Sequence, residues 1–201
     1  MKVRNILLFS FAILLGLAAV FATQVLGQSY TYKGSLIEPP IPAEDFALTD
    51  QHGKTFRLSD HRGEVKLIFF GYTNCPDVCP VTLANFRQIK EQLGDKAGKV
   101  NFVFITVDPQ RDTAERIGEH LANFDPSFIG LTGDQQDLKR IWDAFGVFVE
   151  KVDNGSAAGY EMNHTARVYV VDPSGNLLLT YAFGTESQAM AEDVAHLLDG
   201  G

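Results

Sequence analysis

The only two cysteines of this 201-residue chain lie four positions apart, in the stretch Gly71-Tyr-Thr-Asn-Cys-Pro-Asp-Val-Cys-Pro80. The stretch follows an apolar run, Val65 to Phe70, which is typical of a buried central strand. It precedes an amphipathic helical pattern, Pro80 to Leu93. Each cysteine comes before a proline, and a residue before proline is disfavoured in the α region. The pattern therefore predicts a thiol-bearing loop between a strand and a helix that begins at Pro80.

The position of Cys75 and Cys79 at a helix N-terminus favours thiolates, because the macrodipole and the free N–H groups stabilise negative charge there. Thiolates bind soft metal ions and exchange disulfides, so the pair indicates either a redox dithiol or a two-thiolate metal site. A purely structural disulfide is a third alternative, but so short a loop gains little chain entropy from a cross-link. The spacing alone does not separate a redox pair from a metal site.

Residues 1–27 have the composition of a membrane anchor. Lys2 and Arg4 are their only charged residues, and an almost uninterrupted apolar run extends from Ile6 to Ala22. A membrane-spanning helix needs about 20 such residues. No Ala-x-Ala cleavage site stands out, so we expect an uncleaved signal anchor rather than a cleaved signal. The positive-inside rule places the rest of the chain outside the cytoplasm, facing the periplasm or the cell exterior. The apolar run leaves no room for an Arg/Ser-rich presequence, which favours the inner membrane of a bacterium.

The chain carries a net charge of −8, and its first 27 residues carry only basic charges, so the exported part is more acidic still. This charge argues against a nucleic acid partner, because nucleic acid backbones are bound through Lys and Arg. An exported dithiol meets oxidants, so it must be kept reduced or metal-loaded to act as a pair of ligands.

Residues 28–45, rich in Gly, Ser, Pro and Tyr, predict an extended linker, and residues 46–201 predict a single domain. The expected strands are 46–49, 55–58, 65–70, 100–107, 128–131, 166–171 and 176–183. The expected helices are 80–93, 112–124, 134–145 and 187–198, the second opened by a capping box, Asp112 to Glu115. Residues 148–160 are expected to form an exposed excursion. This order predicts an α/β fold with a central mixed sheet and helices on both faces, in the thioredoxin-like arrangement.

Three motifs together resemble the Sco/SenC family: the cysteine stretch, the segment Val107-Asp-Pro-Gln-Arg-Asp-Thr113, and Asn163-His164 before an apolar strand. That family comprises membrane-anchored, thioredoxin-fold copper proteins that help to assemble the CuA centre of cytochrome c oxidase. The resemblance covers most of the exported domain, and it implies copper ligands at Cys75, Cys79 and His164. Two thiolates suit Cu(I), and an added imidazole gives a site that also tolerates Cu(II).

The resemblance implies a copper chaperone rather than an enzyme, with the copper-bearing subunit of cytochrome c oxidase as its partner. Another periplasmic copper chaperone or a thiol reductant is a further expected partner. The alternatives are a thiol–disulfide reductase that keeps a client's metal-binding cysteines reduced, and a redox sensor or peroxide-type enzyme. Thioredoxin-type oxidoreductases usually carry a cis-proline before the corresponding strand, and the loop Asn163-His-Thr-Ala166 has no proline, which favours the metal site.

The remaining polar candidates receive structural interpretations. Asp77 is interpreted as a favourable charge at the helix N-terminus and Asp108 as a turn residue after a strand, and neither is taken as a ligand. Four further histidines are interpreted as surface or turn residues: His52, His61, His120 and His196.

Overall fold

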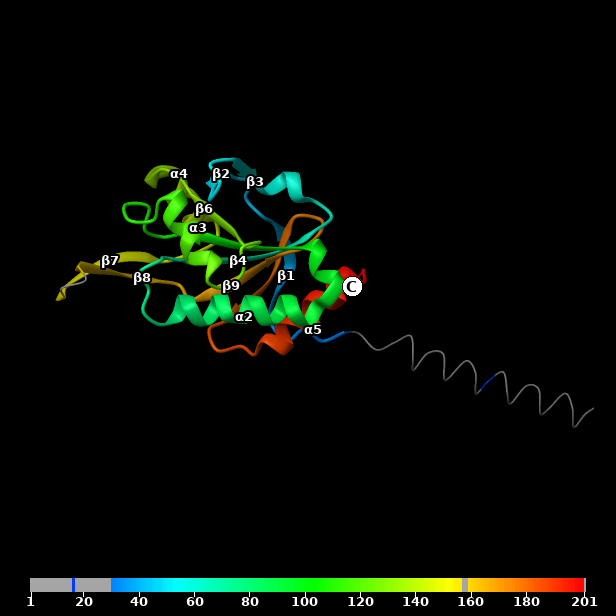
Figure 1. The fold of residues 1–201 in the computed structure, drawn as a ribbon. Helices are drawn as coiled ribbons and strands as arrows, with labels where there is room; N and C mark the ends of the chain where they lie inside the picture. Colours follow the sequence, from blue (N-terminus) through cyan, green and yellow to red (C-terminus); the bar gives the residue numbers. More distant parts are fainter. Residues whose placement is uncertain (1–15, 17–29, 157–158, 201) are drawn as a thin grey trace, which may run out of the picture. The chain divides into compact units, whose positions relative to one another are not determined.

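A sheet of eight strands forms the centre of the structure, a computed structural model that describes residues 16, 30–156 and 159–200 (Figure 1). Its strand order is β1-β10-β9-β4-β5-β6-β2-β3. β4 runs parallel to β5, and β5 to β6, whereas the other neighbours are antiparallel, so the predicted mixed sheet is confirmed. The strands of this sheet are β1 (Ser35–Pro42), β2 (Ala47–Asp50), β3 (Thr55–Arg57), β4 (Val65–Gly71), β5 (Val100–Thr106), β6 (Ile129–Thr132), β9 (Arg167–Val171) and β10 (Asn176–Ala182).

Helices cover both faces of the sheet, as expected for a strand such as β4 whose seven residues are all buried. The Phe86 ring of α2 packs on Phe102, and the Phe145 ring at the end of α4 packs on Phe70. Phe70 pairs in register with Ile105, an odd number of residues from Phe102, so the two contacts lie on opposite faces. α5 packs beside α2, and α3 packs beside β6. The helices are α2 (Val78–Leu93), α3 (Ala114–Ala122), α4 (Gln135–Ala144) and α5 (Ser187–Leu198), with short 3-10 helices at Leu58–His61 and Gly94–Lys99.

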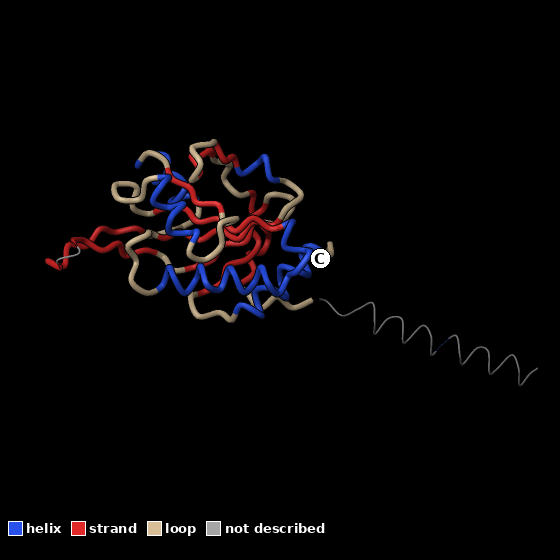
Figure 2. The backbone as a smooth tube through the Cα atoms, in the orientation of Figure 1, coloured by secondary structure: helices blue, strands red, loops and turns tan. Residues whose placement is uncertain are grey.

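A separate two-stranded hairpin, β7 (Val149–Ser156) and β8 (Gly159–His164), projects from the body of the domain (Figures 1 and 2). It includes most of the segment expected to form an exposed excursion, residues 148–160, and this segment is a paired β-hairpin. We call β7 and β8 the histidine hairpin, because His164 is the last residue of β8.

The expectation of a linker up to residue 45 is wrong for its second half. Residues Ser35–Pro42 form β1, the edge strand that pairs with β10. Proline lacks an N–H donor, but an edge strand leaves one side of its backbone unpaired, so prolines are accepted there. The carboxylate of Asp193, a fully buried residue, also accepts hydrogen bonds from the backbone N–H groups of Lys33 and Gly34 at 2.9–3.0 Å. The folded unit accordingly begins at Tyr32.

Two of the predicted helix starts differ from the structure. α2 begins at Val78 rather than Pro80. Pro80 is tolerated in the first turn, because the backbone N–H groups of a first helical turn have no partner within the helix and the missing N–H of proline costs no hydrogen bond there. α3 is capped by Thr113, whose side chain accepts a hydrogen bond from Arg116 N at 3.2 Å, rather than by Asp112. The helix predicted from residue 134 does start with Asp134 as its cap.

The predicted anchor, residues 1–27, lies outside the described residues apart from residue 16. Within the part of the chain that the structure describes, no helix combines the length and the apolar character needed to cross a membrane.

Candidate metal centre

The two thiols come from a loop and from the first turn of the helix that follows it. Residues 72–77, which we call the thiol loop, connect β4 to α2 and carry Cys75, whose N–H donates to Tyr72 O at 3.2 Å. Cys79 is the second residue of α2 and is fully buried, whereas Cys75 is half-buried. The expectation that both cysteines precede the helix is therefore correct for Cys75 and wrong for Cys79.

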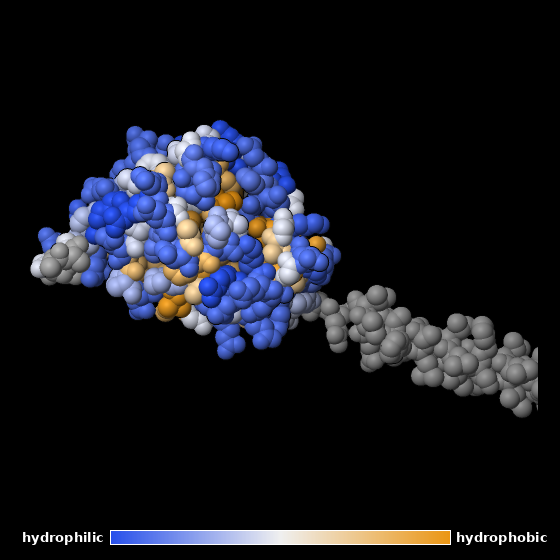
Figure 3. Space-filling view, in the orientation of Figure 1, coloured by the Kyte–Doolittle hydropathy of each residue, from blue (hydrophilic) through white to orange (hydrophobic). Residues whose placement is uncertain are grey.

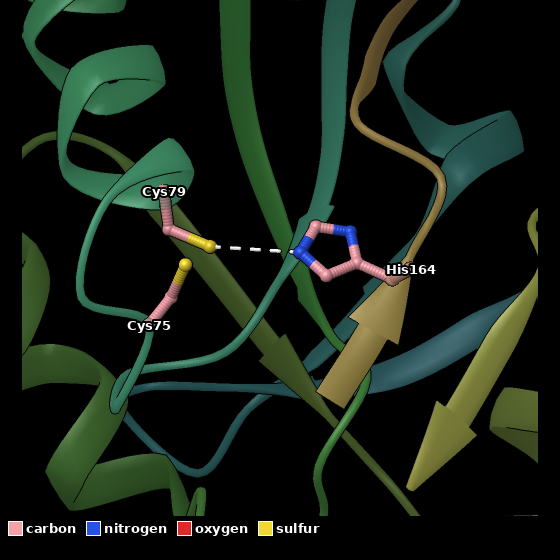
Figure 4. A group of neighbouring side chains, drawn as sticks. All are labelled: Cys75, Cys79 and His164. Carbon is pink, nitrogen blue, oxygen red and sulfur yellow. Dashed lines mark hydrogen bonds between the residues drawn. The ribbon is translucent and has the colours of Figure 1, made fainter. Parts of the chain in front are cut away.

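His164 reaches the thiols from the end of the histidine hairpin (Figure 4). Its Nε2 lies 3.8 Å from the Sγ atom of Cys79. Its Nδ1 lies 3.2 Å from the carbonyl oxygen of Thr165, which can only accept, so Nδ1 carries the proton. This hydrogen bond fixes the tautomer that leaves the Nε2 lone pair facing the sulfur, the second-shell arrangement seen for metal-binding histidines.

The three side chains have the spacing of a metal site. One ligand atom from each of Cys75, Cys79 and His164 lies within 4.8 Å of the other two. Among the described residues, these three form the cluster of His, Cys, Asp or Glu side chains that could hold a metal ion. With metal–ligand bonds of about 2.0–2.3 Å, as for zinc, a trigonal centre separates its sulfur and nitrogen ligands by about 3.8 Å. Two sulfurs and one imidazole form a soft donor set, which suits copper or zinc and not magnesium or calcium.

The two thiols differ in pKa, because a hydrogen bond links them and they are buried to different extents. A hydrogen bond from the Cys79 thiol lowers the pKa of Cys75, and the backbone N–H groups of Asp77 and Cys79 act in the same direction. The same hydrogen bond raises the pKa of Cys79, and burial raises it further. The pair therefore titrates as a unit in which Cys75 carries the negative charge and Cys79 holds the proton. The expectation that the helix N-terminus favours a thiolate at both positions is therefore correct for Cys75 and wrong for Cys79, which is buried in the first turn of α2.

Aromatic rings enclose the imidazole on two sides. The rings of Phe69 and Tyr72 each meet His164 edge-on, with centroids 6.0 Å apart. The pKa of Tyr72 is raised to about 12, first by burial and then by the neighbouring charge of Cys75, so its hydroxyl stays neutral. The rings limit the access of water to the site on those sides and restrict the directions in which the imidazole can turn.

Gly71, the last residue of β4, leaves the space that Cys79 occupies. A Cβ atom at this position would lie 2.9 Å from the Cys79 Sγ and 2.8–2.9 Å from the rings of Phe69 and Phe104. All three neighbours are buried, so none can move away freely.

The substitution Gly71→Ala should therefore displace the Cys79 sulfur and lower the free energy of unfolding by about 1–3 kcal/mol, the usual cost of overpacking a core. Denaturant unfolding measures the stability, and a metal titration of the folded variant measures the site. Gly98→Ala is a matched control, because no atom lies within 4 Å of a Cβ built there. Equal stability and equal metal affinity of the two variants would contradict this assignment.

The other polar candidates are not brought to the site as ligands. Asp77 is an exposed residue at the N-cap of α2 whose side chain caps no N–H group. Asp108 is buried and bonded to Arg111 and to Tyr160, so it is more than a turn residue. The interpretation of His120 as a surface residue is wrong, because its Nε2 is buried, without a hydrogen-bond partner among the described residues.

Comparisons with known proteins identify the family of the chain. The sequence profile of the SCO1/SenC family matches residues 36–199. A SCO2-like protein of Rickettsia conorii is 38% identical over 149 residues, which are 74% of this chain and 73% of that protein. The structure of Bradyrhizobium japonicum ScoI with copper bound is 37% identical, with a TM-score of 0.70 over 78% of this chain and 97% of that one. Yeast Sco1 with copper bound is 28% identical, with a TM-score of 0.71 over 81% and 91% of the two chains. The thioredoxin-like fold predicted from the sequence is thus confirmed, and the chain belongs to the SCO1/SenC family.

Proposed function

We propose that the chain binds one copper ion through Cys75, Cys79 and His164. The observation that carries the proposal is the convergence of three soft or borderline ligand atoms within 4.8 Å, with the imidazole tautomer already set for binding. The copper-bound structures of two relatives support copper as the metal rather than zinc. Two thiolates hold Cu(I), and the imidazole extends the site to Cu(II). Loading the reduced protein without oxygen tests this directly: one copper per chain is expected, and none for the double variant Cys75→Ser/Cys79→Ser.

The copper is cargo in this proposal, and the protein delivers or primes it for the CuA centre of cytochrome c oxidase. Membership of the SCO1/SenC family supports this role, and the copper-bearing oxidase subunit is the proposed partner. Another periplasmic copper chaperone or a thiol reductant would act upstream.

Exposed apolar side chains near the ligand-bearing segments suit a surface that binds another protein. They are Val81, two residues after Cys79, Phe148, whose N–H donates to Thr165 Oγ1, and Phe183, whose N–H donates to Ala166 O. Figure 3 shows one face of the domain, largely hydrophilic with apolar side chains gathered between the hydrophilic areas.

A second function, thiol–disulfide exchange, is favoured by the unequal thiols. A half-exposed thiolate beside a buried thiol is the arrangement of an attacking and a resolving cysteine. Because the pKa of Cys75 is lowered, its thiolate persists as the pH falls below the ordinary thiol pKa of about 8.5. Iodoacetamide at pH 6 should then modify Cys75 and leave Cys79 protonated and unmodified. Peptide mass spectrometry identifies which cysteine carries the modification. Equal labelling of both cysteines, or of neither, would contradict the assigned asymmetry.

The localisation is also a proposal: a single-pass anchor within residues 1–27 holds the domain on the outer side of the bacterial inner membrane. The apolar run from Ile6 to Ala22 and the preceding Lys2 and Arg4 support it. Mass spectrometry of the native N-terminus should find the anchor intact in the membrane fraction. A soluble exported form that begins near Gln28 would show a cleaved signal instead, with the site chemistry unaffected.

A further inference from the structure

The two halves of the candidate metal centre belong to separate parts of the fold. The thiol loop extends from the main sheet, whereas the strands of the histidine hairpin pair only with each other within the described chain. A two-stranded hairpin is marginally stable alone in water, so contacts with the body of the domain must fix its position. The segment Asp108-Pro-Gln-Arg-Asp112, which follows β5 and which we call the 108–112 turn, contacts both halves.

At one end of the 108–112 turn, Asp112 holds the thiol loop. Asp112 is 1% exposed, and its carboxylate accepts hydrogen bonds from the Thr73 hydroxyl at 2.6 Å and the Thr73 N–H at 3.1 Å. The hydroxyl of Thr106, on β5, donates to the same carboxylate at 2.7 Å. Thr73 lies two residues before Cys75. A buried carboxylate with several donors thus fastens the thiol loop to the end of the neighbouring strand.

At the other end, Asp108 and Arg111 hold the histidine hairpin through one residue, Tyr160. The Tyr160 hydroxyl donates to the carboxylate of Asp108 at 2.7 Å, and Asp108 is 2% exposed. Arg111 Nη1 donates to the Tyr160 carbonyl at 2.8 Å, and its guanidinium lies 3.7 Å from the centroid of the Tyr160 ring. Arg111 Nε also pairs with Asp108. Tyr160 is the second residue of β8 and lies four residues before His164, so its hydroxyl, ring and carbonyl all hold the strand that ends in the imidazole.

The turn between the two ends is itself tied together. The N–H groups of Arg111 and Asp112 donate to the Asp108 carbonyl at 3.1 and 2.9 Å, and Asp108 N donates to the Thr106 hydroxyl at 2.9 Å. Arg111 Nη2 is buried, without a hydrogen-bond partner among the described residues. Its guanidinium also lies 5.8 Å from the Tyr72 ring, so Arg111 contacts both the thiol loop and the hairpin.

We propose that the 108–112 turn is a bracket that sets the position of His164 relative to the two thiols, with Arg111, Asp108 and Asp112 as positioning residues. The inference rests on the proposed copper site and adds to it the residues that make the third ligand available. Loosening the Tyr160 end of the bracket should release the imidazole while leaving both thiols in place. The variants should therefore lose affinity for Cu(II), which depends on the imidazole, far more than affinity for Cu(I).

The first test measures the hairpin without any metal. Tyr160→Phe removes the hydroxyl but keeps the ring, and Arg111→Gln removes the guanidinium. Glu161→Gln, at the exposed neighbouring position, is the matched control. Hydrogen exchange of the β8 amides in the metal-free full-length protein should be faster by about tenfold in the two variants, as expected when a hydrogen bond to a charged group is lost. The β4 amides should not change, and the control should match the wild type. Unchanged β8 exchange in both variants would overturn the bracket.

The second test adds copper to the same proteins. Both variants should show on the order of tenfold weaker Cu(II) binding, the low end of the usual effect of removing a group that orients a ligand. Their Cu(I) affinity should stay close to that of the wild type. Equal losses of Cu(II) affinity and Cu(I) affinity would contradict the proposal that the bracket positions His164. A wild type that binds no copper, with variants that still exchange faster, would contradict the proposed function and leave the bracket supported as a structural tie.

Discussion

Replacing His164 by Ala should abolish stable Cu(II) binding while leaving a weaker Cu(I) site made by Cys75 and Cys79. The imidazole is the one nitrogen ligand of the group, and Cu(II) favours nitrogen donors more strongly than Cu(I) does. In the wild type, the thiolate-to-Cu(II) charge-transfer absorption and the electron paramagnetic resonance spectrum should report bound Cu(II). Both signals should disappear in the variant, and Cu(I) competition with a chelator should still detect a site.

The matched control is His52→Ala. His52 is an exposed residue in the turn between β2 and β3, so the substitution removes an imidazole without touching the site. The control should keep the wild-type spectra. An unchanged charge-transfer spectrum in His164→Ala would mean that another group completes the site, and the three-ligand account would be wrong.

Oxidation of Cys75 and Cys79 to a disulfide should remove copper binding completely. The two sulfurs lie within 4.8 Å, and the half-buried Cys75 is on a loop, so a bond of about 2.05 Å can form by a small movement. With oxidised glutathione as the added oxidant, the Cys75 thiolate attacks one glutathione sulfur and releases the other glutathione as a thiolate. Cys79 then displaces the remaining glutathione from the mixed disulfide, so both electrons and the Cys79 proton pass to the two reduced glutathione molecules. A disulfide has no thiolate to offer, and metal affinity depends on deprotonated ligands.

Thiol counting and copper titration of the same samples test this prediction. The oxidised protein should have no free thiols and bind no copper, and a phosphine reductant should restore two thiols and one copper. The single variant Cys75→Ser cannot form the internal bond, so the same oxidant should leave its Cys79 thiol free. Stoichiometric copper binding by the oxidised wild type would show that the thiols are not the ligands.

The sequence predicts most of the strands of the main sheet and the helices of the domain, because these depend on local periodicity. β4 and β5 are mostly apolar, and a strand, the thiol loop and a helix follow one another in the sequence pattern. The prediction failed where a distant partner decides the structure. Residues Ser35–Pro42 look like a spacer, and only the β10 edge, about 140 residues later in the chain, makes them a strand. Asp112 has the pattern of a helix cap, but Thr73 and Thr106 bind its carboxylate, so Thr113 caps the helix instead.

The sequence predicts the three candidate ligands of the site, but not the residues that hold these ligands in position. The cysteine spacing and the histidine before a strand are local signals, and the structure brings all three side chains together. The contacts of Asp108 and Arg111 with Tyr160 join residues about 50 positions apart, which no local pattern indicates. The burial of Asp108 could have been suspected from its place after the buried strand β5, but its partners could not.

X-ray absorption at the copper edge of the reduced, Cu(I)-loaded protein tests the central claim most directly. The account predicts one copper per chain, with two sulfur neighbours and one nitrogen neighbour, and the loss of the nitrogen in His164→Ala. A first shell of two sulfurs alone in the wild type, or a spectrum that His164→Ala does not change, would contradict it.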